Sequence, residues 1–163
     1  MKSASPMLVI VLSITLFDLA HADDTGSRLS LQLGPRIYHY DPDPEHNNDT
    51  WLTGLELESA ERWLAGAVSF RNSFHQRSSY IYFGKRWFPD VLPEDVYVKL
   101  TGGLLLGYKE PYENKIPLNH RDGIGFGVLP AVGYQFERAN VQLVLLGTAG
   151  LMVTLGVDLL KLD

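Results

Sequence analysis

Hydrophobic and polar side chains alternate along most of the chain that follows its N-terminal segment. Residues 28–33 read R-L-S-L-Q-L, so that three leucines share one face and the polar side chains share the other. A period of two is typical of a β-strand, because successive side chains of a strand point to opposite faces. Gly34-Pro35 is expected to bend this first strand, and residues 37–40 to continue it.

Seven further strands are predicted at intervals that suit a barrel. They are expected at 51–58, 62–74, 79–88, 96–108, 125–137, 141–147 and 152–161. The connections alternate between short ones at 59–61, 89–95 and 138–140 and long polar ones at 41–50 and 109–123. Spanning strands of about ten residues, with short turns at one end and long loops at the other, are typical of outer-membrane barrels. The pattern predicts an all-β protein, an eight-stranded antiparallel outer-membrane β-barrel; a soluble barrel of the lipocalin type is the alternative.

The N-terminal segment has the pattern of a secretory signal peptide. Lys2 is followed by an apolar run at 7–17 and then by Ala20-His21-Ala22, an A-x-A cleavage box. We therefore expect residues 1–22 to be a signal peptide and residues 23–163 to form the barrel domain in the outer membrane. Aromatic residues near the predicted strand ends are expected to form interfacial girdles: Trp51, Trp63, Tyr80, Tyr82, Trp87, Tyr97, Tyr108 and Tyr134.

Composition narrows the classes of partner. The 163-residue chain carries a formal net charge of −5 and has no cysteine, so that nucleic-acid binding and a disulfide framework are disfavoured. The stretch 41–49 is acidic, but His46 occupies the position that an EF-hand loop gives to glycine. We expect a solvated loop there, no bound metal and no cofactor.

Two predicted strand ends carry residues that could perform chemistry. His39 lies at the end of the first strand, and Asn72 and Ser73 lie at the end of the third. An antiparallel meander places both ends at one rim, which would unite a base, an amide and a hydroxyl. Strict alternation would put His39 on the leucine face of its strand, so that the hypothesis requires a β-bulge near Gly34-Pro35.

The order and spacing of several short motifs resemble those of the lipid A palmitoyltransferase (PagP) family. Residues 70–74 read Phe-Arg-Asn-Ser-Phe where the family has Phe-Lys-Asp-Ser-Trp, and Tyr38 precedes His39 where the family has a tryptophan before its catalytic histidine. Gly84 follows Ser73 by eleven residues, the spacing of the family's pocket-floor glycine. Residues 129–134, Leu-Pro-Ala-Val-Gly-Tyr, are similar to the family's Pro-Leu-Ala-Ser-Val-Gly-Tyr.

The resemblance implies an enzyme that moves a palmitoyl chain from a phospholipid to a lipid A hydroxyl. His39 would deprotonate the acceptor, and Asn72 would orient His39 or donate to the oxyanion. Ser73 would be a nucleophile or a hydrogen-bonding group, and Gly84 would select the chain length. The family's motif aspartate is Asn72 here, which lends the histidine no negative charge.

Further residues fit this interpretation. Pro130 cannot donate a ladder hydrogen bond, so it would weaken pairing between strands six and seven or five and six and give lateral access to an acyl chain. Arg71, Arg77 and Arg121 are expected to contact lipid A phosphates. The expected partners are a phospholipid donor and a lipopolysaccharide acceptor around a membrane-embedded monomer. A non-catalytic barrel and a lipid A deacylase are the alternatives.

Overall fold

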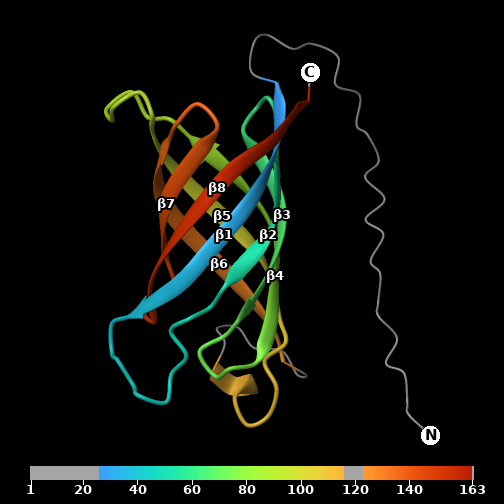
Figure 1. The fold of residues 1–163 in the computed structure, drawn as a ribbon, viewed down its shortest axis with the longest axis vertical. Helices are drawn as coiled ribbons and strands as arrows, with labels where there is room; N and C mark the ends of the chain where they lie inside the picture. The colour runs from blue at the N-terminus through green and yellow to red at the C-terminus, as the bar shows by residue number, and fades with distance from the viewer. Residues whose placement is uncertain (1–25, 116–122, 163) are drawn as a thin grey trace, which may run out of the picture.

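The computed structural model describes residues 26–115 and 123–162, which form a closed antiparallel barrel of eight strands (Figure 1). The strands are β1 (Ser27–His39), β2 (Leu52–Glu58), β3 (Trp63–Arg71), β4 (Arg77–Trp87), β5 (Val96–Leu106), β6 (Ile124–Gln135), β7 (Ala139–Leu145) and β8 (Gly150–Leu162). A 3₁₀ turn at Glu113–Lys115 is the helical element of the described residues. The predicted fold class is therefore confirmed. The proposed signal peptide at 1–22 lies outside the described residues.

Each strand pairs with the next, and β8 pairs with β1 to close the sheet. The connections 40–51, 72–76 and 146–149 and the described part of the β5–β6 connection, 107–115, meet at one end of the barrel, which we call the long-loop rim (the lower end in Figure 1). The connections 59–62, 88–95 and 136–138 meet at the other end, the short-loop rim. Among the described residues no helix is long and apolar enough to cross a membrane.

The outer face of the barrel is apolar, and much of the interior is polar. Side chains alternate along each strand, and the outward positions carry large exposed hydrophobic residues, among them Leu55, Ile81, Phe83, Leu100, Leu104, Phe126, Val128, Leu143, Val153 and Leu155. A belt of this kind is unfavourable in water and favourable in lipid. The arrangement is compatible with an outer-membrane barrel and is the inverse of a soluble one.

The aromatic residues are divided between the two faces. Trp51, Trp63 and Trp87 are exposed on the outside, as a girdle requires. Tyr80, Tyr82 and Tyr97 are buried inside the barrel, so that the girdle prediction is wrong for them. The reason is strand parity, because inward and outward positions alternate and a residue near a strand end can occupy either.

A β-bulge in β1 reverses which side chains face the lumen in the last residues of that strand. The register against β8 shifts between Leu33 and Arg36, which is where the sequence required a bulge. Beyond it, Ile37 is buried, and His39 lines the interior. The prediction of a bulge near Gly34-Pro35 is confirmed, and it brings the imidazole into the lumen.

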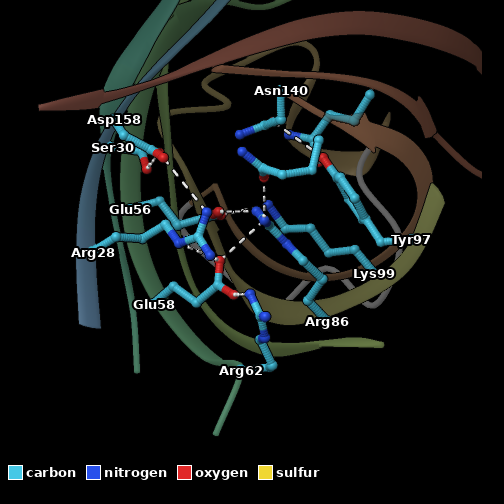
Figure 2. A network of polar contacts seen from close by, with 12 residues as sticks. Arg28, Ser30, Glu56, Glu58, Arg62, Arg86, Tyr97, Lys99, Asn140 and Asp158 are labelled. Carbon is cyan, nitrogen blue, oxygen red and sulfur yellow. Dashed lines mark hydrogen bonds and ion pairs between the residues drawn. The ribbon is translucent and has the colours of Figure 1, made fainter. Parts of the chain in front are cut away.

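Charged side chains fill the lumen toward the short-loop rim (Figure 2). Arg86 lies 3.6 Å from Glu56 and 3.1 Å from Glu58, and Lys99 pairs with Glu56. A buried charge must be paired to be tolerated, and here each carboxylate meets at least two basic groups or a hydroxyl. We call this group the charged layer; its members are Arg28, Glu56, Glu58, Arg62, Arg86, Lys99 and Asp158.

Candidate active site

Between the charged layer and the long-loop rim the lumen contains a cavity of about 540 Å³. Its walls are mostly apolar and come from all eight strands and the β7–β8 connection; they include Ile37, Leu52, Val68, Phe70, Tyr80, Leu105, Leu129, Val144, Leu146 and Met152. His39 and Ser73 stand at the rim end of the same cavity. A pocket with apolar walls and a few polar groups at one end suits a ligand with a long hydrocarbon tail and a polar head.

Ser73, His39 and Asn48 form a continuous line of hydrogen bonds. The Ser73 Oγ lies 2.8 Å from His39 Nε2, and His39 Nδ1 lies 2.8 Å from Asn48 Oδ1. An amide oxygen can only accept, so that Nδ1 carries the ring proton and Nε2 accepts from the Ser73 hydroxyl. This is the geometry of a hydroxyl activated by a neutral histidine, with a third group orienting the ring.

Residues 47–50 hold the two rim segments together. The backbone N–H of Ile37 donates to the carbonyl of Asn48 at 2.8 Å, which fixes this segment beside β1. On its other side, the N–H of Asn47 donates to the carbonyl of Ser73 at 2.8 Å. The Asn47 side chain adds a bond to the carbonyl of Asn72 at 3.2 Å. The segment therefore positions the histidine strand and the serine turn relative to each other.

Asn72 has a different role from the predicted one. Its side chain is fully buried, and Oδ1 accepts from the N–H groups of Phe74 and Gln76 at 2.9 and 3.0 Å. Its Nδ2 donates to the hydroxyl of Ser78 at 3.1 Å. Those bonds shape the turn that presents Ser73 and leave Asn72 with no bond to His39. The expectation that Asn72 orients the histidine is corrected: Asn48 occupies that place.

A row of rings borders the histidine. The His46 ring lies 5.1 Å from that of His39 and 5.5 Å from that of Phe74, measured between centroids. Phe74 in turn stacks on Tyr112 at 4.1 Å and meets Tyr108 edge-on at 6.4 Å. Burial raises the pKa of Tyr108 to about 12, so its phenol is neutral near pH 7. The row limits the space in which the His39 ring can rotate.

Sequence reasoning found His39 and Ser73 and missed Asn48 and His46. Both missed residues lie in the polar connection 40–51, where no period indicates which side chains turn inward. Only their residue types could have identified them, because the amide of Asn48 and the imidazole of His46 can bind or border a histidine and lie within ten residues of His39 in the sequence.

Gly84 faces the lumen but does not line the cavity. It lies between Tyr82 and Arg86 on the inward side of β4 and pairs with Thr101 of β5. A Cβ at Gly84 would come within 2.3 Å of the Leu100 carbonyl oxygen. The small residue therefore permits close strand packing, and its predicted role as the floor of the acyl pocket stays a prediction.

Pro130 marks the end of the pairing between β6 and β7. On its other side β6 pairs with β5 without interruption, including Leu100 with Pro130. Pairing with β7 stops at Ala131 and Val144, one residue from the proline. Beyond that point Phe126 and Val128 are exposed on the outer face and also line the cavity. The sequence left open whether Pro130 interrupts the pairing of strand six with strand five or with strand seven, and in the structure the pairing that ends beside it is that of β6 with β7.

Arg71 and Arg77 face each other across β3 and β4 at the long-loop rim. Both are exposed, and neither forms an ion pair within the part of the chain that the structure describes. Arg121 lies outside the described residues. Within 26–115 and 123–162 no group of three or more His, Asp or Glu side chains could hold a metal ion.

No protein-family model matches the chain, and no curated protein matches it. Function is therefore inferred from the cavity, the hydrogen-bonded line at its mouth and the resemblance of the motifs.

Proposed function

We propose that this chain is an acyltransferase of the outer membrane that moves an acyl chain from a phospholipid to a hydroxyl group of lipid A in the outer leaflet. The observation that carries the proposal is the Ser73–His39–Asn48 line, which stands at the mouth of an apolar cavity. A nucleophile, a base and a hydrocarbon pocket are the parts that transfer of a fatty acyl group requires.

The hydrogen bond from Ser73 to His39 favours a two-step reaction. In the first step Oγ of Ser73 attacks the ester carbonyl of the donor while Nε2 of His39 takes the hydroxyl proton. The lysophospholipid leaves with that proton, and an acyl ester remains on Ser73. In the second step His39 takes the proton of the lipid A hydroxyl, which attacks the acyl ester and releases Ser73 with the proton returned to its oxygen.

Asn48 keeps the His39 ring in the tautomer that this reaction needs. Its oxygen accepts from Nδ1, so that Nε2 stays free to act as the base. Asn48 lends no negative charge to the imidazolium that forms in each step, which implies a weaker base than a histidine paired with a carboxylate.

The outer surface supports the choice of substrates. The exposed apolar belt suits a lipid environment, and the gap between β6 and β7 lets a hydrocarbon tail enter from the side. Arg71 and Arg77 carry like charges directly opposite each other, an unfavourable arrangement that a bound phosphate would stabilise. The phosphates of lipid A fit that place.

The proposal is tested by the mass of lipid A from Gram-negative cells that express the protein. We expect the wild-type chain to add the mass of one acyl group and both His39→Ala and Ser73→Ala to abolish the addition. His75→Asn is the matched control, because His75 is an exposed histidine in the same turn as Ser73 and has a positive φ that asparagine tolerates. Lipid A of unchanged mass in cells with the folded wild-type barrel would overturn the proposal.

Deacylation is the second candidate, because the same three side chains can pass the acyl group to water. It would lower the mass of lipid A or of the phospholipid pool by one acyl chain, so that the sign of the mass change separates the two reactions. A solute channel is disfavoured by the charged layer, which fills the lumen with paired side chains.

A further inference from the structure

We propose that Tyr82 and Lys99, held by Glu56, form the floor of the acyl cavity and limit it to chains of ~12 carbons. The inference rests on the proposed function and specifies its donor. It differs from the expectation drawn from the motif resemblance, in which the floor would lie at Gly84 and the chain would be palmitoyl.

The floor is a set of inward side chains that meet across the lumen. Tyr82 reaches over Gly66 of the neighbouring strand, where a Cβ would come within 2.3 Å of the tyrosine ring. Its hydroxyl donates to Glu56 Oε2 at 2.6 Å, and Lys99 Nζ binds the same oxygen. The glycine thus makes room for the ring to lie across the lumen, and the carboxylate fixes the ring and the ammonium in place.

The environment changes abruptly at this level. Above Tyr82 the inward positions carry apolar side chains such as Val68 and Leu105, which pack around Tyr80 and Tyr82. Below it the lumen holds Glu56, Arg86 and Glu58, all almost fully buried. An alkyl chain that went deeper would have to separate buried ion pairs, and an unpaired buried charge costs several kcal/mol. The chain is therefore expected to end where the ion pairs begin.

The register of β1 and β8 gives the depth of the cavity. His39 at the rim pairs with Gly150, and Gln32, which also lines the cavity, pairs with Gly156, six residues along β8. Six rises of about 3.3 Å on a strand tilted by about 40° descend about 15 Å along the barrel axis. Carbon atoms joined by bonds of about 1.5 Å advance about 1.3 Å each in an extended chain, which gives ~12 carbons.

The test compares donors that differ in chain length. Purified protein in detergent micelles is given dilauroyl, dimyristoyl or dipalmitoyl phosphatidylcholine together with lipid A, and acyl transfer is followed by mass spectrometry. We expect lauroyl transfer to exceed palmitoyl transfer by about tenfold or more, since even one methylene that a pocket cannot hold changes the rate by about that factor. Tyr82→Ala removes the ring and is expected to move the preference to the longer chains.

Two variants separate the floor from general damage. Phe83→Ala changes the next residue of β4, which points to the outside, and is expected to leave the chain-length profile unchanged. Tyr82→Phe keeps the ring and loses the bond to Glu56, and is expected to retain the lauroyl preference. A wild-type enzyme that prefers palmitoyl, or a profile that Tyr82→Ala does not move in a folded barrel, would overturn the proposal.

Binding to the Ser73→Ala protein distinguishes the two proposals. Native mass spectrometry is expected to show dilauroyl phosphatidylcholine bound in preference to the dipalmitoyl lipid, with the preference lost in Ser73→Ala/Tyr82→Ala. Selective binding combined with a wild-type protein that transfers no acyl chain would reject the proposed enzyme and retain the floor. Transfer without any dependence on chain length would reject the floor alone.

Discussion

Replacing Glu56 by glutamine should destabilise the barrel more than any other isosteric change in its interior. Glu56 has a relative exposure of 2% and binds Lys99, Arg86 and the hydroxyl of Tyr82. Glutamine keeps the shape and one acceptor oxygen but removes the charge. The charged layer would then hold two carboxylates, Glu58 and Asp158, against four basic side chains.

The magnitude follows from the state of the partners. Lys99 has a side-chain exposure of 6% and Arg86 of 1%, so that water cannot replace the lost carboxylate. Removing one member of a buried ion pair costs about 3–5 kcal/mol, and the remaining Arg86–Glu58 pair at 3.1 Å places the expected loss near the lower limit. We therefore expect a decrease of about 3 kcal/mol in the free energy of unfolding.

The assay is equilibrium unfolding by urea in detergent micelles, followed by tryptophan fluorescence. Glu56→Gln/Lys99→Met is the matched double variant, because it removes the base together with the acid. It should recover most of the loss, since an uncompensated buried charge costs more than a missing pair. A single variant within about 0.5 kcal/mol of the wild type, or a double variant as unstable as the single one, would refute the reasoning.

Three further predictions concern the site and its support. Asn48→Ala should lower the rate of acyl transfer by about 10²-fold or more, because the tautomer of His39 is no longer fixed. Asn48→Asp should restore the rate, because it keeps an oxygen that accepts from His39 Nδ1. Equal rates for the two variants would contradict the role of this side-chain oxygen. Gly133→Ala should lower the free energy of unfolding by about 1–3 kcal/mol, because the new Cβ would meet the Tyr97 ring at 2.3 Å. Gly102→Ala should cost less, because its Cβ would make only an ordinary contact with Phe126 at 3.5 Å. The pKa of Tyr108 is raised from 10.0 to about 12, so that the stability contributed by its neutral phenol is complete below pH 10 and is lost as the pH rises toward 12. Tyr108→Phe should reduce this loss of stability at alkaline pH. Thermal unfolding measured between pH 10 and 12 tests the prediction.

The fold could be predicted because the alternation of apolar and polar residues within a strand indicates which of its faces is outward. Leu29, Leu31 and Leu33 indicate an outward face by themselves, and the Gly-Pro pair after them marks the bulge. Strand bounds differ by at most three residues from the predicted ones, and the largest difference is at β3, which ends at Arg71 because the turn held by Asn72 begins there.

The site could be predicted only where it lies on strand ends. His39 and Ser73 follow from topology, because the ends of β1 and β3 must meet at one rim. Asn72 was chosen for its proximity to Ser73, but an asparagine beside a turn can bond to the N–H groups that follow it, and Asn72 does so. Asn48 is positioned by backbone hydrogen bonds between the connection 40–51 and the strands β1 and β3, and no local sequence pattern predicts such bonds.

The floor of the cavity could not be read from one strand. The parity of β4 correctly puts Gly84 inside, but the depth of the cavity depends on which side chains of other strands reach across the lumen. Tyr82 meets Glu56 of β2 and Lys99 comes from β5, residues that are 26 and 43 positions from Glu56 in the sequence. Such cross-lumen pairs depend on the closed barrel as a whole.

The charged layer also bears on permeability. Paired guanidinium, ammonium and carboxylate groups occupy the lumen, so that moving an ion past them would mean displacing a fixed counter-charge. On the proposed function, such a barrel would combine a hydrocarbon pocket near one rim with a lumen that opposes the passage of ions.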